Sequence, residues 1–140
     1  MTPGDHGARI EPIQPPGWAA PSGYSNAIAV SGATKLVFVA GQVAWDEKKQ
    51  LVGAGDFARQ FEQALANVVA CLKAAGAEPT ALVRLTIYVT DKRQYLAAAK
   101  EIGGSYKRLV GRHYPAMALV QVAALLEEGA LVEIEATAAI

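Results

Sequence analysis

The sequence predicts one α+β domain with the element order β-β-α-β-α-β-β. Runs of apolar and β-branched residues predict the strands, two stretches with an apolar residue every three or four positions predict the helices, and glycines and prolines separate them. A chain of 140 residues has room for one hydrophobic core and little more. Helices that connect strands in this order cover one face of a mixed sheet, so we expect both helices on the same side.

The first 21 residues contain five of the seven prolines. Because proline fixes φ and has no amide hydrogen, we expect residues 1–21 to form an arm without strands or helices, held in place by Trp18. Residues 22–140 are expected to form the domain itself. Its first two strands, Ala27–Val30 and Leu36–Val43, are predicted to pair with each other across a glycine-containing turn.

A change in the apolar period predicts the first helix. Its stripe consists of Phe57, Phe61, Leu65, Val68 and Leu72. Asp56 is the expected N-cap, because its carboxylate can accept hydrogen bonds from the first free backbone N–H groups. Gly76 suits the left-handed residue that follows a last helical turn.

The second helix is predicted after the strand Leu82–Thr90, with Asp91 as its N-cap. Its apolar stripe runs from Tyr95 to Leu109. Gly103 and Gly104 lie inside this helix, and each costs about 1 kcal/mol of helix stability relative to alanine. The pair therefore predicts either a locally weak helix or a close packing partner.

Two final strands, Met117–Leu125 and Ala130–Ala138, are predicted around a hairpin loop. The sheet face that the helices leave open would carry Leu131, Glu133 and Glu135 on the last strand. A half-apolar face without a helix over it favours a second copy of the chain as its partner. We therefore expect a homo-oligomer.

Composition excludes several function classes. The 13 basic and 13 acidic residues give a net charge of zero, which argues against nucleic-acid binding. The single cysteine, Cys71, excludes an internal disulfide and is interpreted as a buried structural thiol. The two histidines leave no familiar zinc-ligand set. Since no apolar run reaches the roughly 18 residues of a membrane helix and no export leader is recognisable, we expect a cytoplasmic protein.

Four motifs closely resemble those of the Rid family, also called YjgF or, in older naming, L-PSP endoribonuclease. They occur in the family's order at Val37–Gln42, Gln63–Val68, Val83–Val89 and Val132–Ala136. The likeness extends over most of the chain, from about residue 24 to residue 138. The resemblance implies a chorismate-mutase-like fold and a homotrimer whose three sheets form a central barrel, with one ligand pocket at each subunit interface.

Rid proteins of the RidA type hydrolyse reactive enamines and imines to keto acids and ammonia without a metal or cofactor. By this resemblance, Glu133 would position the attacking water as a general base or orienting group. The backbone N–H groups of Ala40 and Gly41 would hold the carboxylate end of the substrate, and Tyr24 would close the pocket. An arginine in a Pro-Ala-Arg-Ser motif should clamp the same carboxylate in a bidentate pair.

This chain departs from the family at the arginine. Met117 occupies that position, and Leu119 stands where a small polar residue or cysteine is common. A thioether cannot pair with a carboxylate, and the loss of such a charged partner costs roughly 2–5 kcal/mol. Met117 and Leu119 therefore favour an uncharged or more apolar ligand than a 2-imino acid. Arg112 in the preceding loop is a possible substitute clamp.

These observations favour a Rid-type small-molecule hydrolase with an altered substrate. Two alternatives stay open: a non-catalytic ligand-binding or regulatory trimer, and an ordinary 2-imino acid deaminase. Ribonuclease or translation-inhibitor activity is the least favoured, given the balanced charge. His113 is a less favoured candidate base, and Arg84 is expected to pair with Glu135 rather than to contact a ligand.

Overall fold

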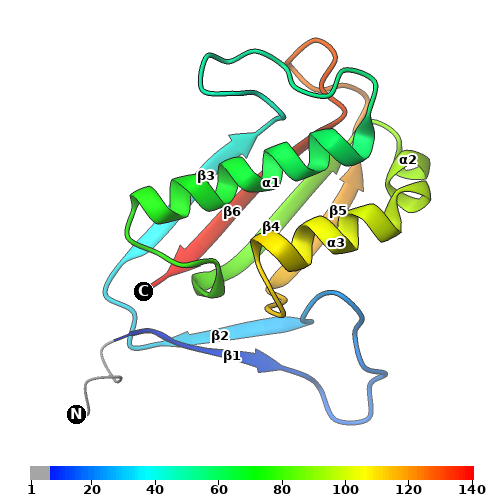
Figure 1. The fold of residues 1–140 in the computed structure, drawn as a ribbon. Helices are drawn as coiled ribbons and strands as arrows, with labels where there is room; N and C mark the ends of the chain where they lie inside the picture. Colours follow the sequence, from blue (N-terminus) through cyan, green and yellow to red (C-terminus); the bar gives the residue numbers. More distant parts are fainter. Residues whose placement is uncertain (1–6) are drawn as a thin grey trace.

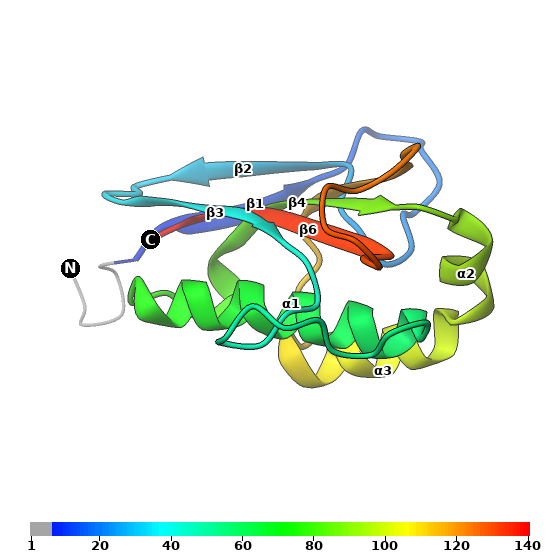
Figure 2. The ribbon, with the colours of Figure 1, turned by 90° about the horizontal axis from the view of Figure 1, so that it is seen from above.

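The computed structural model describes residues 7–140 and contains a mixed four-stranded sheet with the helices packed on one face (Figure 1 and Figure 2). This architecture confirms the predicted α+β class. The strands are β1 (Arg9–Ile13), β2 (Ala27–Ser31), β3 (Leu36–Gln42), β4 (Leu82–Val89), β5 (Ala116–Gln121) and β6 (Val132–Ala139). The helices are α1 (Phe57–Ala74), α2 (Lys92–Ala97) and α3 (Ala99–Leu109), with a 3₁₀ turn, η1 (Pro79–Ala81), before β4.

The main sheet has the strand order β3-β6-β4-β5, in which β4 and β5 are parallel and the other neighbours are antiparallel. Side chains alternate between the two faces of each strand. On β4, Leu85, Ile87 and Val89 are buried under the helices, and the residues between them face the open side. The predicted hairpin of the last two strands is wrong, because β4 lies between β5 and β6. Both strands are also shorter than predicted: β5 ends at Gln121 and β6 begins at Val132.

Helix α1 forms as its sequence predicts. The carboxylate of Asp56 accepts a hydrogen bond from the backbone N–H of Arg59 at 3.1 Å, and Gly76 follows the helix with a φ of 85°. The apolar stripe faces the sheet, where Phe61 and Leu65 are almost fully buried. Burying one such side chain stabilises the fold by about 1.5–3 kcal/mol.

In place of the single second helix that the sequence predicts, the structure has two helices, α2 and α3, with a break at Ala98. Asp91 caps α2 by accepting a hydrogen bond from the backbone N–H of Arg93 at 2.9 Å, and this bond is the main reason that the pKa of Asp91 lies below its usual value. Gly103 and Gly104 do not cause the break, since both lie within α3. Among the described residues, no helix combines the length and the apolar character needed to cross a membrane.

The prediction that the proline-rich segment contains no strand is wrong over Arg9–Ile13. β1 pairs antiparallel with β2, and Pro12 lies opposite Ile28. These two strands form a separate two-stranded sheet, so Pro12 occupies an edge strand, where proline is tolerated. The expected pairing of the strands now labelled β2 and β3 is also wrong, because β2 pairs with β1 and β3 pairs with β6. Residues 1–6 of the expected arm lie outside the described residues.

Hydrogen bonds at Ser25 tie the N-terminal segment to the start of β5. The backbone N–H of Ser25 donates to the carbonyl of Pro115 at 3.1 Å, and its hydroxyl donates to the carbonyl of Tyr114. Trp18, the expected anchor, is exposed. The chain just before β2 is therefore held beside β5, and this places the neighbouring Tyr24 next to a strand that is distant in sequence.

Candidate functional site

Glu133 lies against Gly41 at a β-bulge between β6 and β3. Val39 pairs with Ala136 and Gln42 pairs with Ile134, so the register leaves Ala40 and Gly41 without paired residues on β6. A Cβ atom added to Gly41 would lie 2.8 Å from the carboxyl carbon of Glu133. A larger residue at this position would therefore displace the carboxylate, and the bulge keeps a backbone segment directly beside it.

The open face of the sheet carries a second carboxylate on the same strand. The hydroxyl of Tyr88 donates a hydrogen bond to Oε1 of Glu135 at 2.7 Å. This hydrogen bond is the main reason that the pKa of Tyr88 is raised above its usual value. Glu135 is thus occupied by a neighbouring side chain, whereas the side chain of Glu133 has no hydrogen bond or ion pair among residues 7–140.

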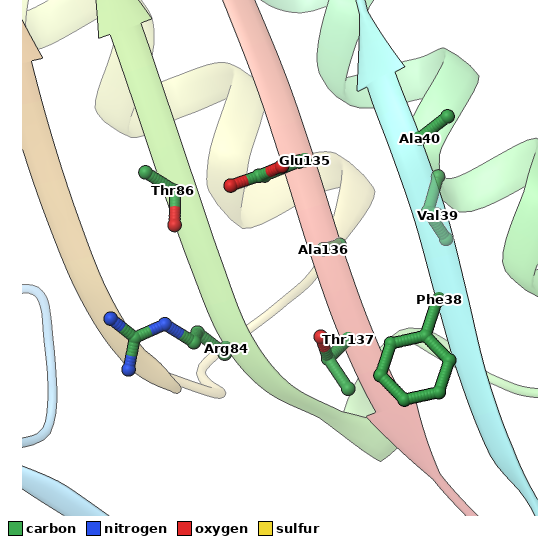
Figure 3. A pocket seen from close by; sticks show the side chains of 8 residues that line it. All are labelled: Phe38, Val39, Ala40, Arg84, Thr86, Glu135, Ala136 and Thr137. Carbon is green, nitrogen blue, oxygen red and sulfur yellow. The ribbon is translucent and has the colours of Figure 1, made fainter.

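Figure 3 shows a cavity of about 460 Å³ on this open face. Its lining consists of Phe38, Val39, Ala40, Arg84, Thr86, Glu135, Ala136 and Thr137. The Arg84 side chain points away from Glu135 toward the β5 edge in this view, and neither ion pair of the described residues includes Arg84. The expected pairing of Arg84 with Glu135 is therefore not present; the Tyr88 hydroxyl contacts Glu135 instead.

The other candidate residues meet on the opposite side of the sheet, at the edge formed by β5. Tyr24, Met117 and Leu119 line a cavity of about 240 Å³ that we call the Tyr24 pocket. Its remaining lining residues are Ser22, Gly23, Ile87 and Tyr95. Met117 and Leu119 pack against the core on the helix-facing side. No Asp, Glu, Lys or Arg side chain lines this pocket, so its lining carries no formal charge, and Ser22, Tyr24 and Tyr95 contribute hydroxyl groups.

The structure thus separates the candidate site into two groups. Glu133 belongs to the same alternating set on β6 as Glu135 and faces the open side, while Met117 faces the helices. Within one chain, Glu133 with Ala40 and Gly41 forms one half, and Tyr24 with Met117 and Leu119 forms the other. A side chain on one face of a sheet cannot reach the other face, so one chain does not assemble both halves around one ligand.

The substitute residues considered from the sequence find other roles. Nε2 of His113 lies 2.6 Å from the carbonyl oxygen of Leu82, so the ring donates a hydrogen bond to backbone and has a structural role. Arg112 is exposed and is not among the residues around either cavity. The prediction that Cys71 is buried is wrong: it is exposed, because the next residue, Leu72, points inward and a helix turns by about 100° per residue.

Several residues near these cavities were not predicted from the sequence, Tyr95, Ile87 and Tyr88 among them. Tyr95 lies on the apolar stripe of the second predicted helix, so its pattern could not be told from that of a core residue. Ile87 and Tyr88 alternate on β4 and line opposite faces. Within the described residues, no group of three His, Cys, Asp or Glu side chains is placed to hold a metal ion.

Comparison with known proteins identifies the family. A model of the family described as Endoribonuclease L-PSP matches residues 16–140. The chain belongs to this family, the one whose motifs the sequence resembles. It is 33% identical over 129 residues to the human protein named 2-iminobutanoate/2-iminopropanoate deaminase, covering 92% of this chain and 87% of the relative. It is 38% identical over 115 residues to Protein DfrA of Myxococcus xanthus, covering 82% and 83%.

Solved structures show the same fold. The Rid-family protein YyfB of Yersinia pestis, described as a protein of unknown function, superposes with a TM-score of 0.80 at 35% identity, covering 94% of this chain and 98% of its own. Rv2704 of Mycobacterium tuberculosis, a member of the YjgF/YER057c/UK114 family, has a TM-score of 0.59 at 35% identity, covering 84% and 87%.

Proposed function

We propose that the protein is a Rid-type small-molecule hydrolase, related to the enamine and imine deaminases, whose substrate is not a simple 2-imino acid. One observation carries this proposal: the carboxylate of Glu133 lies against Gly41 at the bulge, while Met117 and Leu119 make the other half apolar. The human, bovine and rat relatives are named 2-iminobutanoate/2-iminopropanoate deaminases, which supports the general chemistry.

In this proposal Glu133 acts on water. Its free carboxylate accepts a proton from a water molecule whose oxygen bonds to the imine carbon, and the C=N π electrons become a lone pair on nitrogen, which takes up a proton. The resulting carbinolamine loses ammonia as its C–N bond breaks, and its oxygen becomes the carbonyl. Water and imine thus give a ketone and ammonia, and no redox step or cofactor is needed.

The site is proposed to form between copies of the chain in a homotrimer. The two halves face opposite sides of the sheet, so the Glu133 half of one copy must meet the Tyr24 pocket of another. The open face supports this assembly, because Phe38 is 74% exposed and Leu36 is 57% exposed on β3. Large apolar side chains grouped on an open sheet face are typical of interfaces.

Hydrolysis of 2-iminopropanoate tests the proposed specificity. The imine is generated in situ from alanine by an amino-acid oxidase with catalase present. We expect the unmodified protein to be nearly inactive on 2-iminopropanoate and the Met117→Arg variant to be active. A guanidinium at residue 117 can pair with the substrate carboxylate, which Met117 cannot. Leu126→Arg serves as the matched control, since it adds the same charge at a fully exposed residue that lines neither cavity.

If the unmodified protein is as active as Met117→Arg, the proposed change in specificity is contradicted. The ordinary 2-imino acid deaminase then becomes the favoured function. A second candidate function, a non-catalytic ligand-binding trimer, is favoured by the loss of a charged clamp at Met117. It would be supported by saturable ligand binding together with silence of both the unmodified protein and Met117→Arg.

A further inference from the structure

A second cavity adjoins the Tyr24 pocket, between α3 and the start of β5. We call this cavity, of about 220 Å³, the Tyr106 pocket; it is lined by Gly23, Phe61, Ile87, Tyr95, Ala99, Ile102, Gly103, Tyr106, Tyr114 and Met117. It shares Gly23, Ile87, Tyr95 and Met117 with the Tyr24 pocket. Met117 therefore borders both cavities, and a ligand that contacts Met117 from one side has apolar space on the other.

Aromatic rings form much of this second cavity. The rings of Tyr106 and Tyr114 are stacked, with centroids 5.6 Å apart and planes 6° from parallel. The Tyr106 hydroxyl donates a hydrogen bond to the carbonyl of His113, so its polar atom is occupied. Burial raises the pKa of both Tyr95 and Tyr106, in line with their positions in an apolar wall. No Asp, Glu, Lys or Arg side chain is among the lining residues.

Gly103 lies on the side of α3 that borders this cavity. A Cβ atom added there would meet no heavy atom within 4 Å, so close packing does not require glycine at this position. A glycine inside a helix nevertheless lowers helix stability. The neighbouring Gly104 lines a different hollow, and a Cβ there would meet only the Arg108 guanidinium at 3.6 Å. Gly103 thus leaves open space beside Tyr106, although glycine at this position lowers the stability of α3.

We propose that the Tyr106 pocket binds the aromatic part of an uncharged substrate whose polar end lies at Met117 and Tyr24. A cavity of roughly 150 Å³ lined by apolar side chains accommodates benzene, so the volume suffices for one ring. Aromatic walls favour a flat partner through stacked or edge contacts. This inference deepens the proposed function, on which it rests for the reaction at the polar end, but ring binding itself does not depend on turnover.

Methyl NMR of the methionines tests this proposal directly, because the chain has only Met1 and Met117. The probe is phenylacetamide, an uncharged ring with a polar head, added to full-length protein labelled with ¹³C at the methionine methyl groups. We expect a saturable ring-current shift of the Met117 signal. Acetamide, which lacks the ring, should produce no saturable shift, and phenylacetate should bind more weakly because its charge has no partner.

Gly103→Leu and Gly104→Leu form the matched pair of variants. Leucine at residue 103 fills the cavity and should weaken phenylacetamide binding by about tenfold or more, whereas leucine at residue 104 should change it by less than about twofold. Leucine favours helix more than glycine does, so both variants should fold, and thermal unfolding verifies this.

The proposal is overturned if the Met117 signal does not shift saturably, or if both leucine variants weaken binding equally. Its failure is distinguishable from failure of the proposed hydrolase. A protein that hydrolyses imines without binding phenylacetamide contradicts only the Tyr106 pocket. A protein that binds phenylacetamide at Met117 but leaves the Met117→Arg variant inactive on 2-iminopropanoate contradicts only the hydrolase.

Discussion

The two halves of the candidate site differ in how tightly the structure constrains them. Beside Glu133, a methyl group added at Gly41 would lie 2.8 Å from the carboxyl carbon, so the carboxylate would have to shift. Beside Met117, two adjoining cavities leave room for a ring, and glycine at residue 103 is not required by packing. The half proposed to act on water is therefore closely packed around its carboxylate, while the half proposed to recognise the substrate has room for a different ligand.

The largest effect is expected from Glu133→Gln in the Met117→Arg background. The amide keeps the shape of the side chain but cannot accept the proton, so 2-iminopropanoate hydrolysis should fall by about 10²–10⁴-fold. Initial rates of ammonia release measure this, and Glu135→Gln, which alters the carboxylate bonded to Tyr88, is the control. Equal losses for the two variants would mean that Glu133 has no special role.

Gly41→Ala should have the next largest effect, in the same Met117→Arg background. The new methyl group would displace the Glu133 carboxylate, and a misplacement of about 1 Å costs on the order of 10²-fold in rate. Stability should change little, because the carboxylate is the movable end of a flexible side chain. Ala40→Ser, which adds a hydroxyl group at the neighbouring residue and keeps its backbone N–H, should leave the rate near that of the parent. An unchanged rate in Gly41→Ala would show that the close contact is not functional.

Tyr106→Phe tests the half of the site that contains Met117, and its expected effect on stability is smaller than the effects on rate described above. It removes the hydrogen bond to the His113 carbonyl and should lower the free energy of unfolding by about 0.5–1.5 kcal/mol. Urea denaturation measures this change. Imine hydrolysis at the Glu133 half, assayed with Met117→Arg present, should stay the same; a large loss of turnover with unchanged stability would contradict the separation of the two halves.

Alkaline pH should lower the stability of the folded protein through the buried tyrosines beside Met117. Burial raises the pKa of Tyr95 and Tyr106 in the folded state above the ordinary value of 10.0, so the folded state holds these protons more tightly than the unfolded state does. This contribution to stability is fully present below pH 10.0 and is lost as the pH rises through the folded-state pKa values. Urea midpoints measured across this range should fall less steeply in Tyr106→Phe; parallel curves would contradict the assignment.

Much of the fold could be predicted from local patterns. The stripe from Phe57 to Leu72 and the cap at Asp56 specify α1, and strict alternation specifies β4. The pairing of β1 with β2 could not be predicted, because a proline such as Pro12 usually interrupts a strand. Only the tertiary arrangement shows that Pro12 lies in an edge strand, where it is tolerated. The exposure of Cys71 could not be predicted from the apolar stripe alone, because a single position along the helix separates this exposed side chain from the buried Leu72.

The candidate site was predictable only as a set of residues. The motifs indicate Tyr24, Gly41, Met117 and Glu133, but no local pattern tells which face of the sheet each one occupies relative to the others. That depends on the register between β4, β5 and β6, which is set by long-range pairing. The role of Gly103 was equally hidden, since a helix glycine that borders a cavity has the same sequence signature as one that packs closely.

Complementation between copies tests most directly whether the two halves work together across an interface. Two proteins are prepared: the unmodified chain, which has Glu133 but no clamp, and Met117→Arg/Glu133→Gln, which has the clamp but no carboxylate. Each should be nearly inactive on 2-iminopropanoate alone. Unfolded together and refolded as a mixture, they should regain activity, because Arg introduced at residue 117 of one copy meets Glu133 of another. A refolded mixture that stays as inactive as its components would contradict a site shared between copies.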